Sequence, residues 1–196
     1  FDSGGLSVHD VNQDGLLDIY LAQVGPNQLY IQQEDGQFVE SADAYGIADP
    51  HPGRGVIFAD FDDDGMDDLV IANLETGLDR GSGVLQMYRR VSPSQFEEAT
   101  LSALGGAFQD AFTHISVADI DGDEDLDIFV GCYGDRQLDS PNHYISANNG
   151  CLNHLWVNQG QFQFSQESTR RGLHHTDWTF AAGFADIDRD GDQDLY

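Results

Sequence analysis

The sequence predicts an all-β protein built from repeats of four short antiparallel strands, as in a β-propeller or a similar β-array. Three observations lead to this fold class. An aspartate-rich stretch of nine residues recurs four times, at 10–18, 60–68, 119–127 and 186–194. Each stretch lies between short apolar runs rich in β-branched and aromatic residues, which are typical of buried strands. The first aspartates are 50, 59 and 67 residues apart, and this spacing indicates a repeat architecture.

Each aspartate-rich stretch carries oxygen-bearing side chains at its positions 1, 3, 5 and 9. A lone copy could be a solvated acidic turn, but four copies in register favour a hard cation that takes about 6–8 oxygens, usually calcium. Position 6 is glycine in three copies, where the loop must turn sharply, and position 7 would offer its backbone carbonyl. The expected ligands of three to four Ca²⁺ ions are Asp10, Asn12, Asp14, Leu16 and Asp18; Asp60, Asp62, Asp64, Met66 and Asp68; Asp119, Asp121, Asp123, Asp125 and Asp127; and Asp186, Asp188, Asp190, Asp192 and Asp194.

These stretches are not EF-hands. An EF-hand has a bidentate glutamate at position 12 and continues into a helix. Here position 12 is Leu21, Ile71 or Val130, inside an apolar run. The predicted unit is therefore a strand, a metal loop and a second strand, with the ion held in a tight hairpin.

Each repeat continues with two further strands and a linking segment. The third strand carries Leu29-Tyr30, Met87-Tyr88 or Leu155-Trp156, and the fourth follows a turn and carries Phe38, Phe96, or Phe162 and Phe164. The links contain Tyr45-Gly46-Ile47, Leu104-Gly105-Gly106 and Arg171-Gly172-Leu173. We expect Phe58, Phe129 and Trp156 to pack between neighbouring repeats.

The repeats differ in length at one connection. From the third-strand Leu or Met to the next loop the distance is 31, 32 and 31 residues, whereas from position 9 to that residue it is 11, 19 and 28. The variation falls in residues 73–83 and 132–151. In a four-stranded meander these connections lie on the face opposite the metal loops, so we expect them to recognise a partner.

Charge and hydropathy exclude some classes of function. The net charge is −27, and 20 of the 35 acidic residues lie in the four loops. This balance argues against nucleic-acid binding, which depends on Lys and Arg at phosphates. The chain has no lysine, and we expect Arg89-Arg90 and Arg170-Arg171 to be solvated charges at strand ends. No apolar run approaches the ~20 residues that span a bilayer. Residues 1–196 are expected to form a single propeller portion of a longer chain.

Cys132 and Cys151 are the two cysteines of the chain. They bracket the longest variable connection, at the end of one predicted strand and before the next. A disulfide that closes this loop would contribute about 3 kcal/mol on the chain-entropy model. The pairing predicts a secreted or cell-surface, oxidising location, and two unpaired thiols are the alternative.

The strand–D-x-D/N-x-D-G-x-x-D–strand unit resembles the FG-GAP repeat of integrin α-subunit propellers and the related VCBS repeats. The added pattern from Asn27-Gln28-Leu29-Tyr30 to Phe38 is similar to the cartilage-acidic-protein and UnbV-type group. The resemblance implies a seven- or eight-bladed calcium-stabilised propeller, of which this chain would supply three to four blades. Two departures matter: Glu124 replaces the glycine of the third loop, and Asn12 replaces an aspartate in the first.

The function expected from this resemblance is a secreted or cell-surface module that binds a protein partner or an extracellular ligand and has no catalytic activity. One alternative is a polysaccharide-acting enzyme, for which His174-His175 with Asp177 and Trp178 is the least ordinary cluster. Another is glycan binding by Tyr133, His143, Tyr144 and Trp178. A carboxylate–histidine pair in a deep pocket would favour the enzyme, and a shallow aromatic shelf would favour the sugar.

Overall fold

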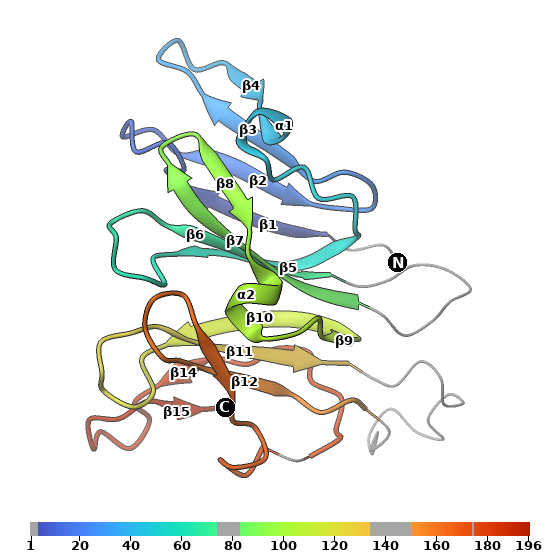
Figure 1. Ribbon diagram of the computed structural model, residues 1–196, viewed down its shortest axis with the longest axis vertical. Helices are drawn as coiled ribbons and strands as arrows, with labels where there is room; N and C mark the ends of the chain where they lie inside the picture. Colours follow the sequence, from blue (N-terminus) through green and yellow to red (C-terminus); the bar gives the residue numbers. More distant parts are fainter. Residues whose placement is uncertain (1–3, 74–82, 134–149, 174) are drawn as a thin grey trace.

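A computed structural model describes residues 4–73, 83–133, 150–173 and 175–196. It shows three four-stranded antiparallel meanders stacked face to face, followed by the first hairpin of a fourth (Figure 1). The predicted all-β class with four-stranded propeller-type blades is therefore confirmed. The number of blades in a complete ring and the division of a longer chain stay predictions.

Each sheet follows the chain order predicted from the repeats. The first sheet contains β1 (Gly5–His9), β2 (Asp18–Ala22), β3 (Gln28–Gln32) and β4 (Phe38–Glu40). The second contains β5 (Gly53–Ala59), β6 (Asp68–Asn73), β7 (Gly83–Ser92) and β8 (Gln95–Glu98), with β9 (Gln109–Asp110) paired to the start of β7. The third contains β10 (Phe112–Ala118), β11 (Asp127–Cys132), β12 (His154–Asn158) and β13 (Phe164–Gln166), and the last hairpin is β14 (Phe184–Ala185) with β15 (Asp194–Leu195).

Two short helices that were not predicted lie in the links between blades. They are α1 (Ala42–Tyr45) and α2 (Thr100–Leu104). Gly46 and Gly105 end them in the left-handed conformation, with φ of 77° and 69°. A glycine after a short polar–apolar run is a known helix stop signal, and the links contained it. No helix in the described part of the chain is long and apolar enough to cross a membrane.

The cores lie between the blades rather than inside them. Phe58 of the second blade meets Tyr20 of the first edge-on, with ring centroids 5.8 Å apart. Trp156 is 1% exposed and belongs to the cluster between the second and third blades. Phe129 meets Phe184 of the last hairpin at 6.4 Å. The predicted inter-blade roles of Phe58, Phe129 and Trp156 are thus confirmed, and full burial of each such side chain stabilises the fold by about 1.5–3 kcal/mol.

The meander places the four aspartate-rich loops at one end of the blades. The hairpins β1–β2, β5–β6, β10–β11 and β14–β15 all turn at the left side of Figure 1. β6 and β11 end at the opposite side, at Asn73 and Cys132. The variable connections 73–83 and 132–151 start and finish there, but residues 74–82 and 134–149 lie outside the described residues.

Candidate metal centre

The first aspartate of each loop holds the turn together. In the second loop the Asp60 carboxylate accepts hydrogen bonds from the backbone N–H groups of Asp64 (3.3 Å) and Gly65 (2.9 Å). The first and fourth loops repeat this pair of contacts through Asp10 and Asp186. These bonds satisfy the donors of the tight turn and fix the carboxylate at its centre.

The ninth residue joins the loop to the third strand of its blade. Asp68 is 1% exposed, and its Oδ2 accepts the N–H of Phe61 (3.2 Å) while its Oδ1 accepts the N–H of Arg90 in β7 (2.7 Å). Asp18 and Asp127 do the same for the first and third blades. The sequence predicted a ligand at this position, and the structure adds a bridge between loop and sheet that local spacing does not reveal.

Burial makes these bridging carboxylates hard to ionise. It raises the pKa of Asp68 to about 7 and that of Asp127 to about 6, although the two backbone N–H donors at each oppose the shift. Burial likewise raises the pKa of Asp18. A cation in the loop would favour the charged form, because an opposite charge within a few ångströms stabilises a carboxylate.

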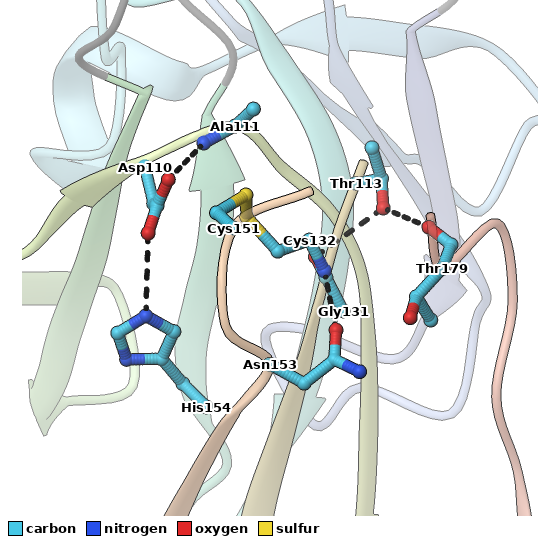
Figure 2. The surroundings of a disulfide bond; sticks show 9 residues. All are labelled: Asp110, Ala111, Thr113, Gly131, Cys132, Cys151, Asn153, His154 and Thr179. Atoms are coloured by element: carbon cyan, nitrogen blue, oxygen red, sulfur yellow. Dashed lines mark hydrogen bonds and ion pairs between the residues drawn. A yellow bond between two sulfur atoms is a disulfide. The ribbon is translucent and has the colours of Figure 1, made fainter. Parts of the chain in front are cut away.

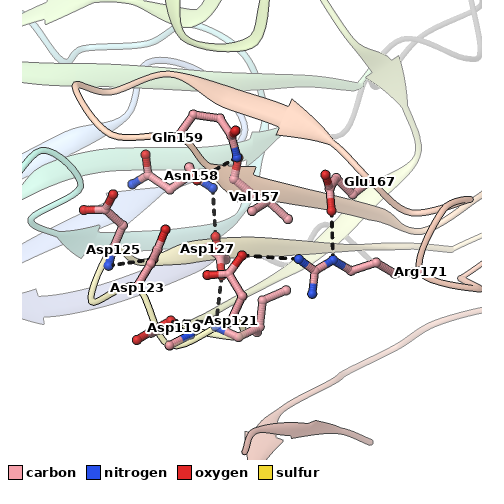
Figure 3. A network of polar contacts seen from close by, with 12 residues as sticks. Asp119, Asp121, Asp123, Asp125, Asp127, Val157, Asn158, Gln159, Glu167 and Arg171 are labelled. Carbon is pink, nitrogen blue, oxygen red and sulfur yellow. Dashed lines mark hydrogen bonds and ion pairs between the residues drawn. The ribbon is translucent and has the colours of Figure 1, made fainter.

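Three of the loops bring together carboxylates from positions 1, 3 and 9. One oxygen of each lies within 4.8 Å of the others in the sets Asp60, Asp62, Asp68; Asp119, Asp121, Asp127; and Asp186, Asp188, Asp194. Figure 3 shows the loop of residues 119–127, with Asp119, Asp121 and Asp127 converging at the hairpin. The aspartates at position 5 instead accept the N–H of position 7, as Asp64 does from Met66 at 2.9 Å.

The second loop provides the sharpest test of whether these residues fit a cation. The Asp62 side chain is 2% exposed, and its Oδ1 is buried without a hydrogen-bond partner. A buried acceptor without a donor is costly, so an ion that bonds to this oxygen would remove the cost. The residues therefore fit a calcium ion that Asp60 and Asp68 would also hold.

The first loop differs because of Asn12. Its amide Nδ2 donates to Asp14 at 2.9 Å, and its Oδ1 accepts the N–H of Asp14 at 3.1 Å. Asp10, Asp14 and Asp18 remain as the acidic side chains of this loop. We therefore expect the first site to bind calcium more weakly than the second.

Two arginines contact the position-3 carboxylates, which the sequence did not predict. Arg89 pairs with Asp62, and Arg171 pairs with Asp121 at 3.3 Å. The prediction that the neighbouring Arg90 is a solvated charge at a strand end is wrong. Arg90 is 1% exposed, lies over the Phe96 ring at 5.7 Å and donates to the carbonyl of Pro93 at 2.7 Å. Its strand position turns the side chain inward, where carbonyls and a ring replace water.

The third loop has its glycine at position 4 instead of position 6, and both positions have a left-handed backbone conformation. Glu124 at position 6 has φ of 76°, whereas Gly122 takes position 4 with φ of 80°. Position 4 is also left-handed in the other loops, at Gln13, Asp63 and Arg189. The strain expected at Glu124 is present, and position 4 is a second left-handed site that the sequence analysis missed.

Replacement of Glu124 by glycine is expected to stabilise the chain by about 0.5–1 kcal/mol. The left-handed conformation costs a non-glycine residue about 1–2 kcal/mol, and the greater freedom of glycine in the unfolded chain offsets part of the gain. Urea denaturation in saturating calcium measures the change. Glu34→Gly in the exposed β3–β4 turn is the matched control and should destabilise; stabilisation by both variants would show that φ is not the cause.

The structure pairs Cys132 with Cys151, as predicted (Figure 2). Their Cα atoms are 5.5 Å apart, and Cys132 is fully buried at the end of β11. The backbone N–H of Cys132 donates to the Asn153 side chain at 2.9 Å. The disulfide therefore anchors both ends of the longest connection to the third blade.

Loss of this disulfide is expected to lower the free energy of unfolding by about 3 kcal/mol, because the reduced chain regains the freedom of a loop of nearly 20 residues. Urea denaturation of the Cys132→Ala/Cys151→Ala variant measures the loss. A reductant should lower the wild-type value similarly and leave the variant unchanged. An unchanged wild type would mean that the two cysteines are not bonded in solution.

The described fold and loops define a class of protein: an all-β repeat protein with propeller-type blades and aspartate-rich hairpins. Residues 10–71 and 60–130 match the family model described as FG-GAP-like repeat, which covers more than half of the chain. The chain belongs to the FG-GAP-like repeat family.

Curated relatives carry the name cartilage acidic protein 1. The chain is 31% identical to the protein from Homo sapiens over 128 residues and 30% identical to that from Mus musculus, in each case over 64% of this chain. The match to the Xenopus tropicalis protein is 28% over 131 residues. The chain spans 18–19% of the length of these relatives.

Proposed function

We propose that the chain is part of a calcium-stabilised extracellular β-propeller that serves as a protein-interaction or cell-adhesion module. The observation that carries the calcium assignment is the buried, unpartnered Oδ1 of Asp62 beside Asp60 and Asp68. Calcium accepts about 6–8 oxygens, so the position-5 side chains and position-7 carbonyls would complete each site. Three to four ions per chain would neutralise carboxylates that otherwise repel one another.

The proposed location is outside the cell, either secreted or on the surface. The Cys132–Cys151 disulfide supports it, because disulfides persist in oxidising compartments. The name of the relatives, cartilage acidic protein 1, and the net charge of −27 agree with an acidic extracellular protein.

The proposed recognition surface is the end of the blades opposite the metal loops, where connections 73–83 and 132–151 vary in length. A scaffold that keeps its metal loops and varies the other end is suited to recognition. The ring is proposed to extend beyond the described blades. Leu6 and Val8 on the first blade are 61% and 51% exposed, at the positions where Val56 and Phe58 pack in the second.

The alternatives receive less support from the described residues. A carboxylate–histidine pair does lie beside a cavity, at Asp49 and His51 (2.6 Å), but the cavity measures about 280 Å³, below the usual size of a small-molecule site, and the Asp49 side chain is fully buried. Tyr133 and Trp178 lie 4.6 Å apart with their rings tilted by 45°, so they pack on each other rather than form a flat shelf. His143, Tyr144 and His174 lie outside the described residues. We therefore propose a non-catalytic module and do not assign a glycan.

Calcium titration by isothermal calorimetry tests the proposal. We expect three to four ions per chain, and the loss of one ion in Asp60→Ala. Asp35→Asn, an exposed acid outside the loops, should leave the count unchanged. Absence of calcium binding, or equal losses in both variants, would overturn the metal assignment.

A further inference from the structure

Two of the metal loops have an arginine on their position-3 aspartate. Arg89 in β7 pairs with Asp62, and its Nε donates to the Asp62 Oδ2 at 2.5 Å. Arg171, in the link after β13, pairs with Asp121 through its Nη2 at 3.3 Å (Figure 3). A guanidinium cannot itself ligate a metal ion, because it stays protonated and has no acceptor atom. The two contacts therefore place a second, fixed cation beside each of these proposed calcium sites.

The second loop shows how an arginine and an ion would share one carboxylate. Arg89 takes the Oδ2 of Asp62 and is itself 47% exposed, so it approaches from the solvent side. The Oδ1 of Asp62 is buried without a hydrogen-bond partner. One oxygen of Asp62 lies within 4.8 Å of oxygens of Asp60 and Asp68. The arginine thus holds one oxygen of Asp62 and leaves the other for the loop, as is usual for a carboxylate that ligates a metal.

The arginine contact accompanies a charged residue at position 3. Arg89 follows Tyr88 in β7, and Ile31 follows Tyr30 at the equivalent place in β3. Ile31 is 5% exposed, and the loop of this first blade carries the neutral Asn12 at position 3. The third loop has an aspartate there and receives its arginine from the link rather than from the third strand. Two different places in the fold supply the same contact, which indicates an electrostatic role rather than one in strand packing.

The arginine offsets part of the loop charge. The second loop has acidic side chains at all four of positions 1, 3, 5 and 9, whereas the first loop has three there. Arg89 sets one positive charge against these four. It lies behind Asp62 and outside the ligand shell, so it cancels only part of that charge, and the second loop remains the tighter calcium site of the two.

A fixed positive charge at this place acts in opposite directions on the empty and the filled loop. In the empty loop it reduces the repulsion among carboxylates whose oxygens gather within 4.8 Å. Toward a bound ion it is repulsive, and a divalent ion feels twice the repulsion of a monovalent one. The Asp62 side chain is 2% exposed, so packing holds it in place even without Arg89. The effect of the charge therefore outweighs any loss of orientation.

We propose that Arg89 and Arg171 are built-in counter-ions that stabilise their loops without calcium and raise the calcium concentration at which those loops fill. This inference rests on the proposed calcium binding and specifies how it is regulated. Arg89 has the larger effect, because its contact is shorter and its carboxylate is more buried than that of Asp121.

A calcium titration followed by NMR, with free calcium set by a chelator, tests the proposal. The N–H of Gly65 donates to Asp60 in the second loop and that of Gly15 to Asp10 in the first, so each amide reports on one loop. Arg89→Met removes the charge and keeps the apolar stem. We expect the Gly65 midpoint to fall by about tenfold, as for the repulsion between a unit charge and a divalent ion at a few ångströms in water. The Gly15 midpoint should stay unchanged.

The empty loop is measured on the same variant by urea denaturation in excess EDTA. Sucrose is present in every sample, because an excluded osmolyte favours the folded chain. The unfolding constant of Arg89→Met should be about fivefold above that of the wild type, at the upper end for an ion pair that is partly exposed. Tighter calcium binding with a less stable empty chain is a combination that a purely structural role would not produce.

Three further variants separate charge from packing. Arg89→Lys keeps the charge and should restore the second-loop midpoint to within about twofold of the wild type. Arg171→Met should lower the third-loop midpoint, reported by the Gly122 amide, by about threefold. Arg170→Met removes the same charge from a side chain that is 79% exposed and pairs with Glu167 outside the loops, so it should change neither midpoint.

Each contrary result has a definite meaning. Weaker calcium binding by Arg89→Met would make the arginine a support for Asp62, and an unchanged midpoint would make it an ordinary surface ion pair; either would overturn the proposal. Equal shifts in Arg170→Met would do so too, by showing a general effect of the net charge of −27. A wild type that binds no calcium would overturn the metal assignment as well, whereas the other results leave that assignment in place.

Discussion

Removal of calcium is expected to lower the free energy of unfolding by on the order of 8–11 kcal/mol. A ligand that binds the folded state alone contributes about 2.7 kcal/mol per site at 100 times its Kd, and the chain has three to four candidate sites. The physical reason lies in the loops, where carboxylate oxygens from positions 1, 3 and 9 gather within 4.8 Å. Without a cation, these charges oppose the hairpin that holds them.

Urea or thermal unfolding in millimolar calcium and in excess EDTA measures this effect. Magnesium is the control, because it requires a smaller octahedral site and gives up water reluctantly, so it should restore little of the stability. Asp62→Ala should reduce the calcium-dependent part by about one site. Equal stability in calcium and EDTA would mean that the loops are acidic turns, and the charge of −27 would need another explanation, such as a high-salt habitat.

The strands and loops could be predicted because their signals are local. The apolar runs around each loop, and the constant distance from the third strand to the next loop, predicted the order of the four strands in each blade. The short strand β9 was not predicted. The short helices were not predicted because four or five residues are too few to show a helical period of apolar residues. The burial of Arg90 was not predicted because it depends on contacts with Phe96 and Pro93 across a hairpin. Its charge alone indicated an exposed side chain.

The residues of the candidate site were predicted from the sequence, but the separate role of each position was not. Spacing marked positions 1, 3, 5, 7 and 9 of each loop as ligands, and the structure separates their roles. Positions 1, 3 and 9 converge, position 5 caps the turn, and position 9 bridges to the third strand through contacts such as that from Arg90 to Asp68. That bridge joins residues 22 positions apart, so no local motif contains it. The cavity beside Asp49 is lined by residues that are far apart in the sequence, from the link before β5 and from β7, so no local pattern predicted it.

The calcium-free chain is expected to become less stable as pH rises from 4 to 8. Burial raises the pKa of Asp68 from its ordinary 3.8 to about 7, and that of Asp127 to about 6. Between these values and 3.8 the folded chain binds more protons than the unfolded chain, so stability is fully present below pH 3.8 and is lost as pH rises. One pKa unit corresponds to about 1.4 kcal/mol, so Asp68 alone would account for ~4 kcal/mol.

Urea denaturation of the calcium-stripped chain from pH 4 to 8, in high salt that screens the surface charges, isolates this effect. Asp68→Asn keeps a carbonyl acceptor but cannot ionise, so its stability should depend less on pH than that of the wild type. Asp35→Asn, at an exposed turn, should retain the wild-type slope. If Asp68→Asn also kept that slope, the backbone donors at Phe61 and Arg90 would outweigh burial, and the carboxylate would be charged without calcium. Saturating calcium should flatten the wild-type curve, because an ion held beside Asp68 takes the place of the proton.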